Sequence, residues 1–481
     1  MSPLPNGLHL FVKRDCPTCR LLEPVVDILQ SRREPLVIYS QDDPTFPDGA
    51  QAVVDDSALE NSYRQKIEVV PTLLRVINGT ETGRIIGWDR AEWEAFTHIV
   101  DLGASLPAAK PGCGALNVLP GIAEELELRY GNSGLQARQI EIATLEDEIE
   151  ACFDRGWSDG LPVVPPTPLR VMRMLEGTAR QPDEVVALVP PNDAPATVEK
   201  IAINAVMAGC KPEYLPVVIA AVEAACDDAF CMRGVLATTW FSGPIVVVNG
   251  PIRQKIGMNS GVNALGQGNR ANATIGRALQ LVIRNVGGGR PGEIDRAVLG
   301  NPGKLGYCFA ENEELSPWES WAEQRGVPAG HSAVTLFAGD GLQGIMDQLS
   351  RTPESLAGSY AASLRSILHP KLALASDAML IVTPEHSRLF RDAGWSKGRL
   401  NDEIMARLQL PRAELERGAG GIMEGTPASR MGAQEFVPKF RDGGLHIVHV
   451  GGTAGMFSAI IGGWPNSGER GTAPVTREIL G

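Results

Sequence analysis

The sequence has no long apolar run, few aromatic residues and a deficit of positive charge, and each shortage excludes a class of protein. No segment reaches the length of charge-free apolar sequence that spans a bilayer, so we expect no membrane partner. The net charge of −13, with no Lys/Arg-rich run, argues against nucleic acid as a partner. Aromatic residues make up 5% of the chain, whereas glycines number 53 and prolines 35, so much of the backbone must lie in turns and tight loops. This composition favours an enzyme over a helical scaffold.

Signals for export are missing as well. The first residues, MSPLPNGLHLFVKR, lack the basic segment and apolar core of a signal peptide, so we expect a cytoplasmic protein. Eight cysteines in such a chain are better interpreted as thiols than as a disulfide framework. The informative cysteines are therefore those with chemical neighbours.

One Cys-x-x-Cys pair, Cys16 and Cys19, follows the apolar strand pattern GLHLFV and opens the helix pattern CRLLEPVVDILQSRR. A thiolate at a helix N-terminus is stabilised by free N–H groups and the helix dipole, which lower its pKa from about 8.5 towards neutrality. Cys16 is therefore the expected nucleophile, and Cys19, one turn on, is the expected resolving thiol. Half a metal site and two unconnected thiols are the alternatives, but no second Cys-x-x-Cys with zinc-ligand spacing follows.

The first hundred residues resemble the thioredoxin superfamily. Pro24 stands where that family has a helix-kinking proline, Val70-Pro71-Thr72 matches its cis-proline loop, and Gly87-Trp88 closes the last strand. The resemblance implies a thioredoxin-like fold with Pro71 beside the dithiol, and a redox-active dithiol in place of a bound cofactor. Arg14-Asp15 before the first cysteine differs from many members, which leaves the redox potential open.

Pattern and composition predict an α/β protein of three parts. Residues 1–103 form the thioredoxin-like domain, in which Asn78-Gly79 predicts a hairpin turn. Residues 104–166, rich in proline and glycine at their start, form a linker and helical connector. From 167 to 481, helix-length apolar periods alternate with β-rich runs such as PIVVVNGP and LHIVHVGG, so we expect a large α/β catalytic domain of one unit or two lobes.

The stretch GMNSGVNALGQGNRANATIGRALQLVIRNVGGGRPG, residues 257–292, joins a Gly/Asn-rich loop to a helix that we expect to be capped near Asn272 or Thr274. Free N–H groups and a guanidinium at such a helix start attract a carboxylate or phosphate, although the stretch is not a GxxxxGK[ST] loop. The alternative is a tight loop packed against a neighbouring domain. The expected substrate-binding residues here are Asn259, Asn269, Arg270, Asn272 and Arg277.

Three further cysteines are candidates for reactive thiols. Cys210 is followed by Lys211, whose charge favours a thiolate and which we also assign to substrate binding. Cys308 is followed by three glutamates, which suit a protonated thiol, a metal ligand or a general acid/base. Cys113, between glycines in a segment expected to be mobile, would carry disulfide exchange from Cys16 to a distant site. The alternatives are a buried, inert thiol at Cys210 and an incidental exposed one at Cys113. For the glutamates after Cys308, an acidic, solvated helix start ahead of Ser316-Pro317 is the favoured interpretation.

The seven histidines offer fewer candidates. His446 and His449 are three apart on an expected strand and therefore face opposite sides, which argues against a shared metal. His386 follows an apolar strand, at the sheet edge where α/β enzymes hold functional side chains, so proton transfer is one interpretation and a core or capping role is the other. The sequence leaves a metal undetermined.

These observations lead to one main hypothesis, a thiol-dependent oxidoreductase whose fused dithiol exchanges disulfides with a cysteine-containing site for a small, anionic substrate. Cys16 would attack a disulfide or thiol adduct at Cys210 or Cys308, and His386 would transfer a proton. A lyase or hydrolase, cysteine- or metal-dependent and kept reduced by the dithiol, is the first alternative, and a redox-switched binding protein is the second. An external reductant and a homo-oligomer stay open as partners.

Overall fold

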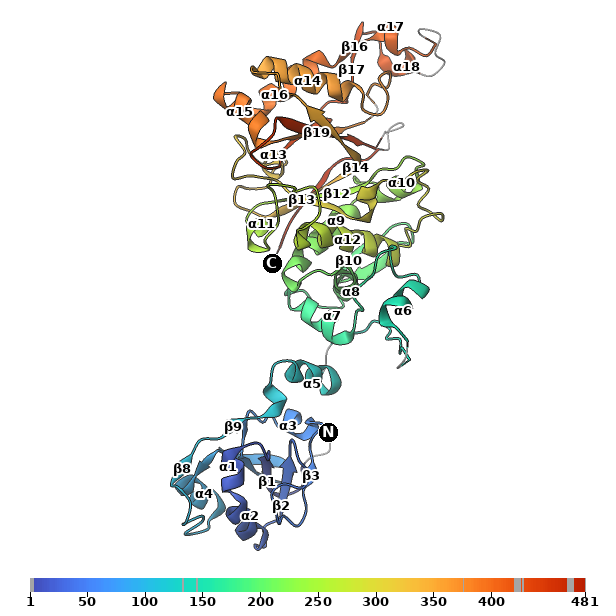
Figure 1. Cartoon of the computed structure of the whole chain (residues 1–481). Helices are drawn as coiled ribbons and strands as arrows, with labels where there is room; N and C mark the ends of the chain where they lie inside the picture. The colour runs from blue at the N-terminus through green and yellow to red at the C-terminus, as the bar shows by residue number, and fades with distance from the viewer. Residues whose placement is uncertain are drawn as a thin grey trace. The chain divides into compact units, whose positions relative to one another are not determined.

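The structure is a computed structural model that describes residues 4–131, 134–143, 146–374, 376–418, 425, 428–464 and 471–480. The chain divides into two compact units, residues 1–133 and 134–481 (Figure 1). Helices and strands occur together in both units, so the expected α/β character is confirmed. Within the described ranges, every helix is too short or too polar to cross a bilayer.

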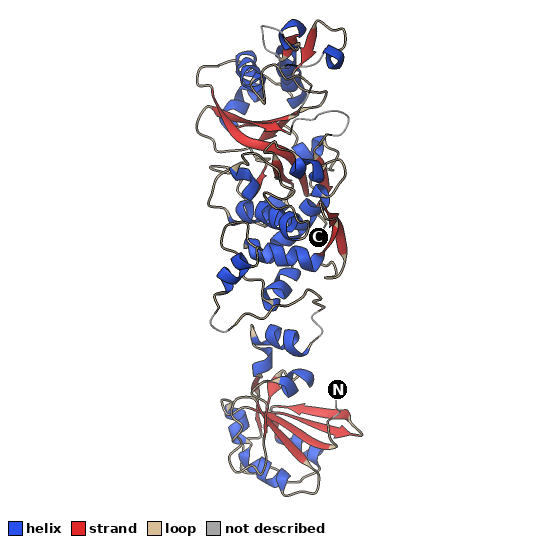
Figure 2. Ribbon diagram, turned by 90° about the vertical axis from the view of Figure 1, so that its right-hand side faces the viewer, coloured by secondary structure: helices blue, strands red, loops and turns tan. Residues whose placement is uncertain are grey.

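The first unit is built on a five-stranded sheet (Figure 2). Its elements in chain order are β1 (Gly7–Val12), α1 (Pro17–Leu21), α2 (Glu23–Gln30), β2 (Leu36–Ser40), β3 (Val54–Asp55), α3 (Glu60–Arg64), β4 (Val69–Val70), β5 (Thr72–Ile77), β6 (Thr80–Ile86), β7 (Trp88–Asp89), α4 (Arg90–Thr97), β8 (Ala109–Lys110), β9 (Cys113–Gly114), η1 (Leu116–Val118) and α5 (Ile122–Tyr130).

Strand β1 is the centre of this sheet, whose order is β3-β2-β1-β5-β6. It pairs in parallel with β2 and antiparallel with β5, and all of its residues are buried. A parallel pair needs a crossover connection, which α1 and α2 provide. β5 and β6 form an antiparallel hairpin whose turn residues, Asn78 and Gly79, both have positive φ, as the Asn-Gly pair predicts. The residues that follow Val12 therefore lie at the end of the central strand.

The segment after residue 103 belongs to the first unit. β8 pairs with β7, and β9 pairs with β4, so the chain folds back over this unit. Gly112 permits the approach, because a Cβ atom there would lie 2.4 Å from Val69 Cγ1 and 2.8 Å from the Val70 carbonyl oxygen. The compact unit ends at residue 133 rather than 103, since these short pairings hold the segment that we expected to be a linker.

The second unit is built on a curled seven-stranded sheet. Its elements are α6 (Glu148–Asp154), α7 (Pro168–Leu175), β10 (Val185–Val189), β11 (Ala194–Thr197), α8 (Val198–Ala208), η2 (Pro212–Tyr214), α9 (Leu215–Ala225), α10 (Met232–Ala237), β12 (Gly243–Asn249), α11 (Ile252–Lys255), α12 (Arg270–Asn285), η3 (Pro302–Leu305), β13 (Tyr307–Ala310), α13 (Trp321–Gln324), β14 (Ala333–Met346), α14 (Pro353–Arg365), β15 (Ala378–Val382), α15 (Pro384–Asp392), α16 (Lys397–Arg407), β16 (Gln409–Pro411), α17 (Arg412–Leu415), α18 (Ala428–Met431), β17 (Phe436–Pro438), β18 (Leu445–His449), β19 (Phe457–Gly463) and β20 (Val475–Glu478).

Strand β14 joins the two halves of this sheet, whose order is β13-β12-β14-β19-β15-β18, with β20 also on β14. The first half of β14 pairs with β12 and the second half with β19. The register shifts between Gly339 and Leu342, and such an irregularity bends a strand. One long strand thereby makes the two halves of the sheet a single unit.

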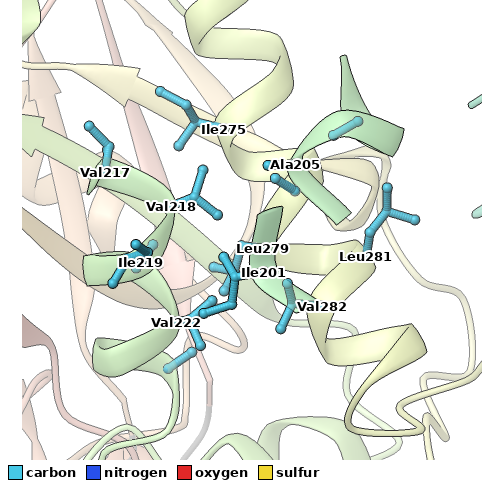
Figure 3. Packing of buried hydrophobic residues seen from close by; sticks show 14 of the residues in the cluster. Ile201, Ala205, Val217, Val218, Ile219, Val222, Ile275, Leu279, Leu281 and Val282 are labelled. Carbon is cyan, nitrogen blue, oxygen red and sulfur yellow. The ribbon is translucent and has the colours of Figure 1, made fainter. Parts of the chain in front are cut away.

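Helices cover both halves of the sheet. The largest hydrophobic cluster joins α8, α9 and α12 to β12 and β14, and Figure 3 shows Ile201, Val218 and Leu279 of these helices packed together. Helix α9, LPVVIAAVEAA, is buried on nearly every side because it has a single charged residue. On the other half, α14, α15 and α16 pack around Tyr360 and Phe390.

Candidate functional site

Cys16 lies just beyond the central strand of the first unit. It is the N-cap of α1, and its sulfur accepts a hydrogen bond from the Cys19 N–H at 3.3 Å. Pro17 takes the first helical position, where no N–H is needed. The helix breaks at Leu22, and α2 begins with Pro24 in its first turn, at the place where the sequence predicts a kink. Because α1 has only five residues, direct hydrogen bonds contribute more to the site than the helix dipole.

The Cys16 sulfur is enclosed by protein. Neither Cys16 nor Cys19 is exposed to solvent. The Cys16 sulfur lies 3.5 Å from the Val70 carbonyl oxygen, to which its thiol donates when protonated. Val70 precedes Pro71, and the peptide bond between them is cis, as the cis-proline loop implies. The structure therefore brings the dithiol and the Val70-Pro71 loop together.

Cys113 lies beside the same sulfur. In the pairing of β4 with β9, Cys113 is opposite Val70, whose carbonyl oxygen contacts Cys16. The Cys113 thiol is partly exposed, and its interaction with the Cys16 sulfur lowers the pKa of Cys16. The sequence predicts a mobile segment between domains at this point. The structure instead holds Cys113 in the first unit, because β9 satisfies the free edge of β4.

The three thiols differ in acidity. The pKa of Cys16 is lowered to about 5, first because the Cys19 thiol donates a hydrogen bond to its sulfur. Further hydrogen bonds from Cys113 and from the N–H groups of Cys19 and Thr18 act in the same direction, whereas burial opposes them. Burial, followed by the contact with Cys16, raises the pKa of both Cys19 and Cys113. With these shifts, Cys16 is a thiolate at neutral pH, whereas Cys19 and Cys113 are protonated.

A short segment, residues 109–118, covers the dithiol, and we call it the strap. The Thr18 hydroxyl donates to the Pro111 carbonyl oxygen at 2.6 Å, and the Lys13 ammonium donates to the Gly114 carbonyl oxygen at 2.9 Å. The strands of the strap, β8 and β9, have only two residues each. Because Cys16 has no solvent exposure, a foreign disulfide reaches its sulfur only after some of the surrounding residues move.

Cys210 and Cys308 are both buried beside α12 in the second unit. The Cys210 thiol donates to the Thr274 carbonyl oxygen at 3.4 Å. Burial raises the pKa of Cys210 to about 12, which is opposite to the direction that its neighbour Lys211 predicts, and Lys211 itself is exposed. Burial, followed by the nearby Cys210, raises the pKa of Cys308. Both thiols are therefore protonated at neutral pH.

The asparagines predicted to bind a substrate hold a loop in place. Asn269, rather than Asn272 or Thr274, caps α12 by accepting a hydrogen bond from the Asn272 N–H at 3.1 Å. The buried side chain of Asn272 accepts from the Asn259 N–H and donates to the Asn259 carbonyl oxygen. This part of the stretch therefore matches the alternative interpretation, a tight loop, which packs here onto its own helix.

The arginines at the start of α12 are engaged as well. Nε and Nη2 of Arg277 each donate to the carboxylate of Asp159 at 2.8 Å. Arg270 donates to the carbonyl oxygens of Gly209 and Cys210. Arg277 is therefore neutralised by an ion pair, whereas Arg270 is exposed and is held by the two carbonyl oxygens.

The glutamates after Cys308 take part in ion pairs. Glu311 is fully buried and lies 3.8 Å from the ammonium of Lys397, which is also buried. Burial raises the pKa of Glu311 and lowers that of Lys397, whereas the charge of each partner opposes its shift. Glu313 and Glu314 both pair with Arg253. These carboxylates therefore stabilise the second unit.

His386 is buried, with both ring nitrogens in hydrogen bonds. Nδ1 lies 2.7 Å from the Ser458 hydroxyl and Nε2 lies 3.0 Å from the Asp347 carbonyl oxygen, which matches the core role rather than proton transfer. His446 and His449 have different partners. Over the described ranges, no group of three or more His, Cys, Asp or Glu side chains is arranged to hold a metal ion.

Comparison of the chain with models of protein families, with curated proteins and with solved structures gives no match. Function is therefore inferred from the geometry of the thiols and of the cavities.

The titration of Cys16 is directly measurable. We expect the reduced chain to gain ultraviolet thiolate absorbance with a midpoint near pH 5, and a Cys16→Ser variant to lack this step. Cys19→Ala removes the strongest donor, so the midpoint should rise by about one pH unit or more. Cys152→Ala, at a thiol of the second unit, is the matched control and should leave the midpoint unchanged. A midpoint near the ordinary value of 9.0 in the wild-type chain would contradict the arrangement.

The same shift determines a pH dependence of stability. The pKa of Cys16 in the folded protein lies below its ordinary value of 9.0, so ionisation of this thiol stabilises the folded state. This contribution to the free energy of unfolding is fully present above pH 9 and is lost as the pH falls through about 5. The unfolding curves of the first unit in the wild-type chain and in Cys16→Ser should therefore converge towards acidic pH.

Lys397→Met leaves Glu311 without its cation in a fully buried position. We expect the free energy of unfolding, measured in urea, to fall by about 3 kcal/mol at neutral pH. The deficit should shrink on acidification, because protonation of Glu311 removes the unpaired charge. Lys255→Met, at an exposed lysine, is the control and should change the free energy by less than about 0.5 kcal/mol. A deficit that does not depend on pH would show that the pair is not ionised.

Proposed function

We propose that the first unit is a thioredoxin-like dithiol–disulfide oxidoreductase in which Cys16 is the nucleophile and Cys19 the resolving thiol. One observation carries the proposal: the Cys16 sulfur caps α1, accepts the Cys19 N–H at 3.3 Å and lies 3.5 Å from the Val70 carbonyl oxygen. The neighbouring thiols of Cys19 and Cys113 lower the pKa of Cys16 to about 5. The parallel crossover from β1 to β2, with the cysteines at its helix start and Pro71 next to the Val70 carbonyl group, supports the thioredoxin-like assignment.

The reaction starts from a disulfide in the substrate. The Cys16 thiolate attacks one of its sulfurs, the substrate S–S bond breaks, and the released thiolate takes up a proton from solvent. Cys19 then loses its proton and attacks the Cys16 sulfur, so the mixed disulfide breaks and the second substrate thiol leaves. A Cys16–Cys19 disulfide results. Two electrons have passed from the dithiol to the substrate, and an external dithiol returns them.

The difference in acidity suits these roles. A low pKa keeps Cys16 ionised for the first attack and makes it a good leaving group when the disulfide is reduced again. Cys19 is buried with a raised pKa, so it stays protonated while Cys16 carries a charge. Once Cys16 is bonded to a substrate sulfur, that charge is gone, and the hydrogen bond that holds the Cys19 proton is weakened.

Cys113 is the third thiol of this proposal. It is partly exposed and lies opposite Val70, where β9 pairs with β4. A substrate strand that displaced β9 would make the same backbone hydrogen bonds to β4, a mode of recognition known as β-strand addition. In the resting protein, Cys113 then occupies the place of the substrate sulfur and donates to the Cys16 thiolate.

The substrate disulfide is proposed to come from outside the chain. Cys210 and Cys308, the partners expected from the sequence, are buried and have raised pKa values. A buried, protonated thiol is neither accessible nor nucleophilic. These properties favour a foreign disulfide over either cysteine as the partner of Cys16.

A Cys19→Ser variant should stop the reaction at the first disulfide. Mild oxidation should join Cys16 to Cys113, because Cys113 pairs with Val70, whose carbonyl oxygen contacts the Cys16 sulfur, and peptide mass mapping of a non-reduced digest identifies the bond. When Cys113→Ser is added, Cys16 should form a mixed disulfide with an added small disulfide instead. Cys16→Ser alone should form neither product. Capture of Cys210 or Cys308 by Cys16 would contradict an external substrate and support exchange within the chain.

Weakening the strap should accelerate the first attack. Thr18→Val keeps the side-chain shape but removes the hydrogen bond to Pro111, which is worth about 1 kcal/mol. Because opening precedes attack, stopped-flow mixing with a chromogenic aromatic disulfide should show Cys16 reacting about fivefold faster. Thr82→Val, at an exposed threonine of β6, is the control. An unchanged rate at an unchanged Cys16 pKa would show that the strap does not limit access.

A further inference from the structure

A cavity in the second unit contains two arginines without carboxylate partners. It consists of two adjacent hollows, of about 530 Å³ and about 370 Å³, and Asn285 and Arg290 line both of them. All of its lining residues belong to the second unit, so a role for it stands independently of the Cys16–Cys19 dithiol.

The larger part of the cavity is apolar over much of its wall. Trp157, Val171, Ile203 and Met207 are among its lining residues. The buried carboxylate of Glu199 also borders it, and both oxygens of that carboxylate accept backbone N–H groups of the protein. A volume of about 530 Å³ suits a small organic molecule.

The smaller part of the cavity is cationic. Arg284 and Arg290 line it, with Asn285 beside them and the exposed Glu293 also in its wall. Among the described residues, neither guanidinium forms an ion pair with a carboxylate, and the one side-chain hydrogen bond of Arg284 is a long contact of 3.5 Å to the Gly156 carbonyl oxygen. Nε of Arg284 and Oδ1 of Asn285 are buried without a partner in the described chain. The charges of the two guanidinium groups are therefore available to an anion in this part of the cavity.

The glycine-rich turn after α12 positions Arg290. Backbone N–H groups of residues 286–289 donate to the carbonyl oxygens of the last helical turn, so the end of the helix presents little negative charge to the cavity. A Cβ atom on Gly287 would lie 2.3 Å from the Pro190 carbonyl oxygen, and Gly288 has a φ of +80°. Glycine is therefore required for the chain to turn back towards the helix end here.

The two arginines are close enough to repel each other. Burial lowers the pKa of Arg284, and the charge of Arg290 lowers it further, although Asp159 and Glu293 act weakly in the opposite direction. Two like charges that face one cavity are relieved when an anion lies between them.

We propose that this cavity binds a small organic anion, a carboxylate or a phosphate monoester, with its charged group between Arg284 and Arg290 and its apolar body in the larger part. Guanidinium groups bind both kinds of anion through charge-assisted, two-point hydrogen bonds. The stretch 257–292 therefore carries an anion site, but at the C-terminal end of α12 instead of at its start.

Calorimetric titration of the full chain with octanoate, octyl phosphate and octanol tests this proposal. Both anions should bind saturably, and octanol, which has the same body without the charge, should bind at least about tenfold more weakly. Arg290→Gln should weaken anion binding about tenfold or more and leave octanol binding unchanged, which also shows that the variant is folded. Glu293→Gln removes a neighbouring negative charge and should strengthen anion binding about twofold.

Arg296→Gln is the matched control, because it removes the same charge from an exposed arginine that does not line the cavity. Cys16→Ser should leave anion binding unchanged, so this proposal and the dithiol proposal fail separately. Stronger binding of octyl phosphate than of octanoate would assign the site to phosphate esters, and the reverse order would assign it to carboxylic acids. Equal binding of octanol and the anions, equal effects of Arg290→Gln and Arg296→Gln, or no saturable binding of either anion would overturn the proposal.

Discussion

A buried thiolate must be surrounded by hydrogen-bond donors, and this requirement shapes the first unit. Cys16 has no solvent exposure, so protein groups alone stabilise the charge on its sulfur. The start of α1 supplies two backbone N–H groups and the Cys19 thiol, while β9 supplies the Cys113 thiol. Segments that are far apart in the sequence therefore meet at one atom. The pairing of β9 with β4, although only two residues long, holds Cys113 next to the Cys16 sulfur.

Because the buried Cys16 thiolate depends on protein donors, the exposure of its sulfur and the pKa of Cys16 change together. When the strap leaves, the Cys16 sulfur loses the Cys113 donor and gains contact with solvent. Loss of a donor moves the pKa of Cys16 upwards from about 5, towards neutral pH, and an attacking thiol is most effective when its pKa is near ambient pH. In the proposed reaction, the closed form would protect an ionised but weakly nucleophilic sulfur, and opening of the strap would both expose that sulfur and make it more nucleophilic. A single movement of the strap accounts for both effects.

Local sequence was sufficient for features formed by neighbours in the chain. The strand that leads into Cys16, the break in the helix near Pro24 and the turn at Asn78 and Gly79 all follow from short patterns. The sequence does not predict the position of Cys113, because a two-residue strand has no periodicity and its partner, Val70, is remote in the sequence. The sequence predicts a lowered pKa for Cys210 from the charge of Lys211. In the structure the pKa is raised, because burial against α12 outweighs the effect of nearby positive charges.

The stretch 257–292 shows why composition locates a charged region more reliably than it identifies the ligand site within it. A guanidinium is available to a ligand only after its partners inside the protein have been counted. Asp159 neutralises Arg277, and backbone carbonyl groups occupy Arg270, whereas Arg284 and Arg290 meet no carboxylate among the described residues. Those partners come from elsewhere in the chain, so no window of sequence reveals them. Glycine permits a close backbone approach in both units. The missing Cβ of Gly112 lets the strap pack against Val69 and Val70 beside the dithiol, and the missing Cβ of Gly287 lets the chain turn at the end of α12, where Arg284 and Arg290 line the cavity.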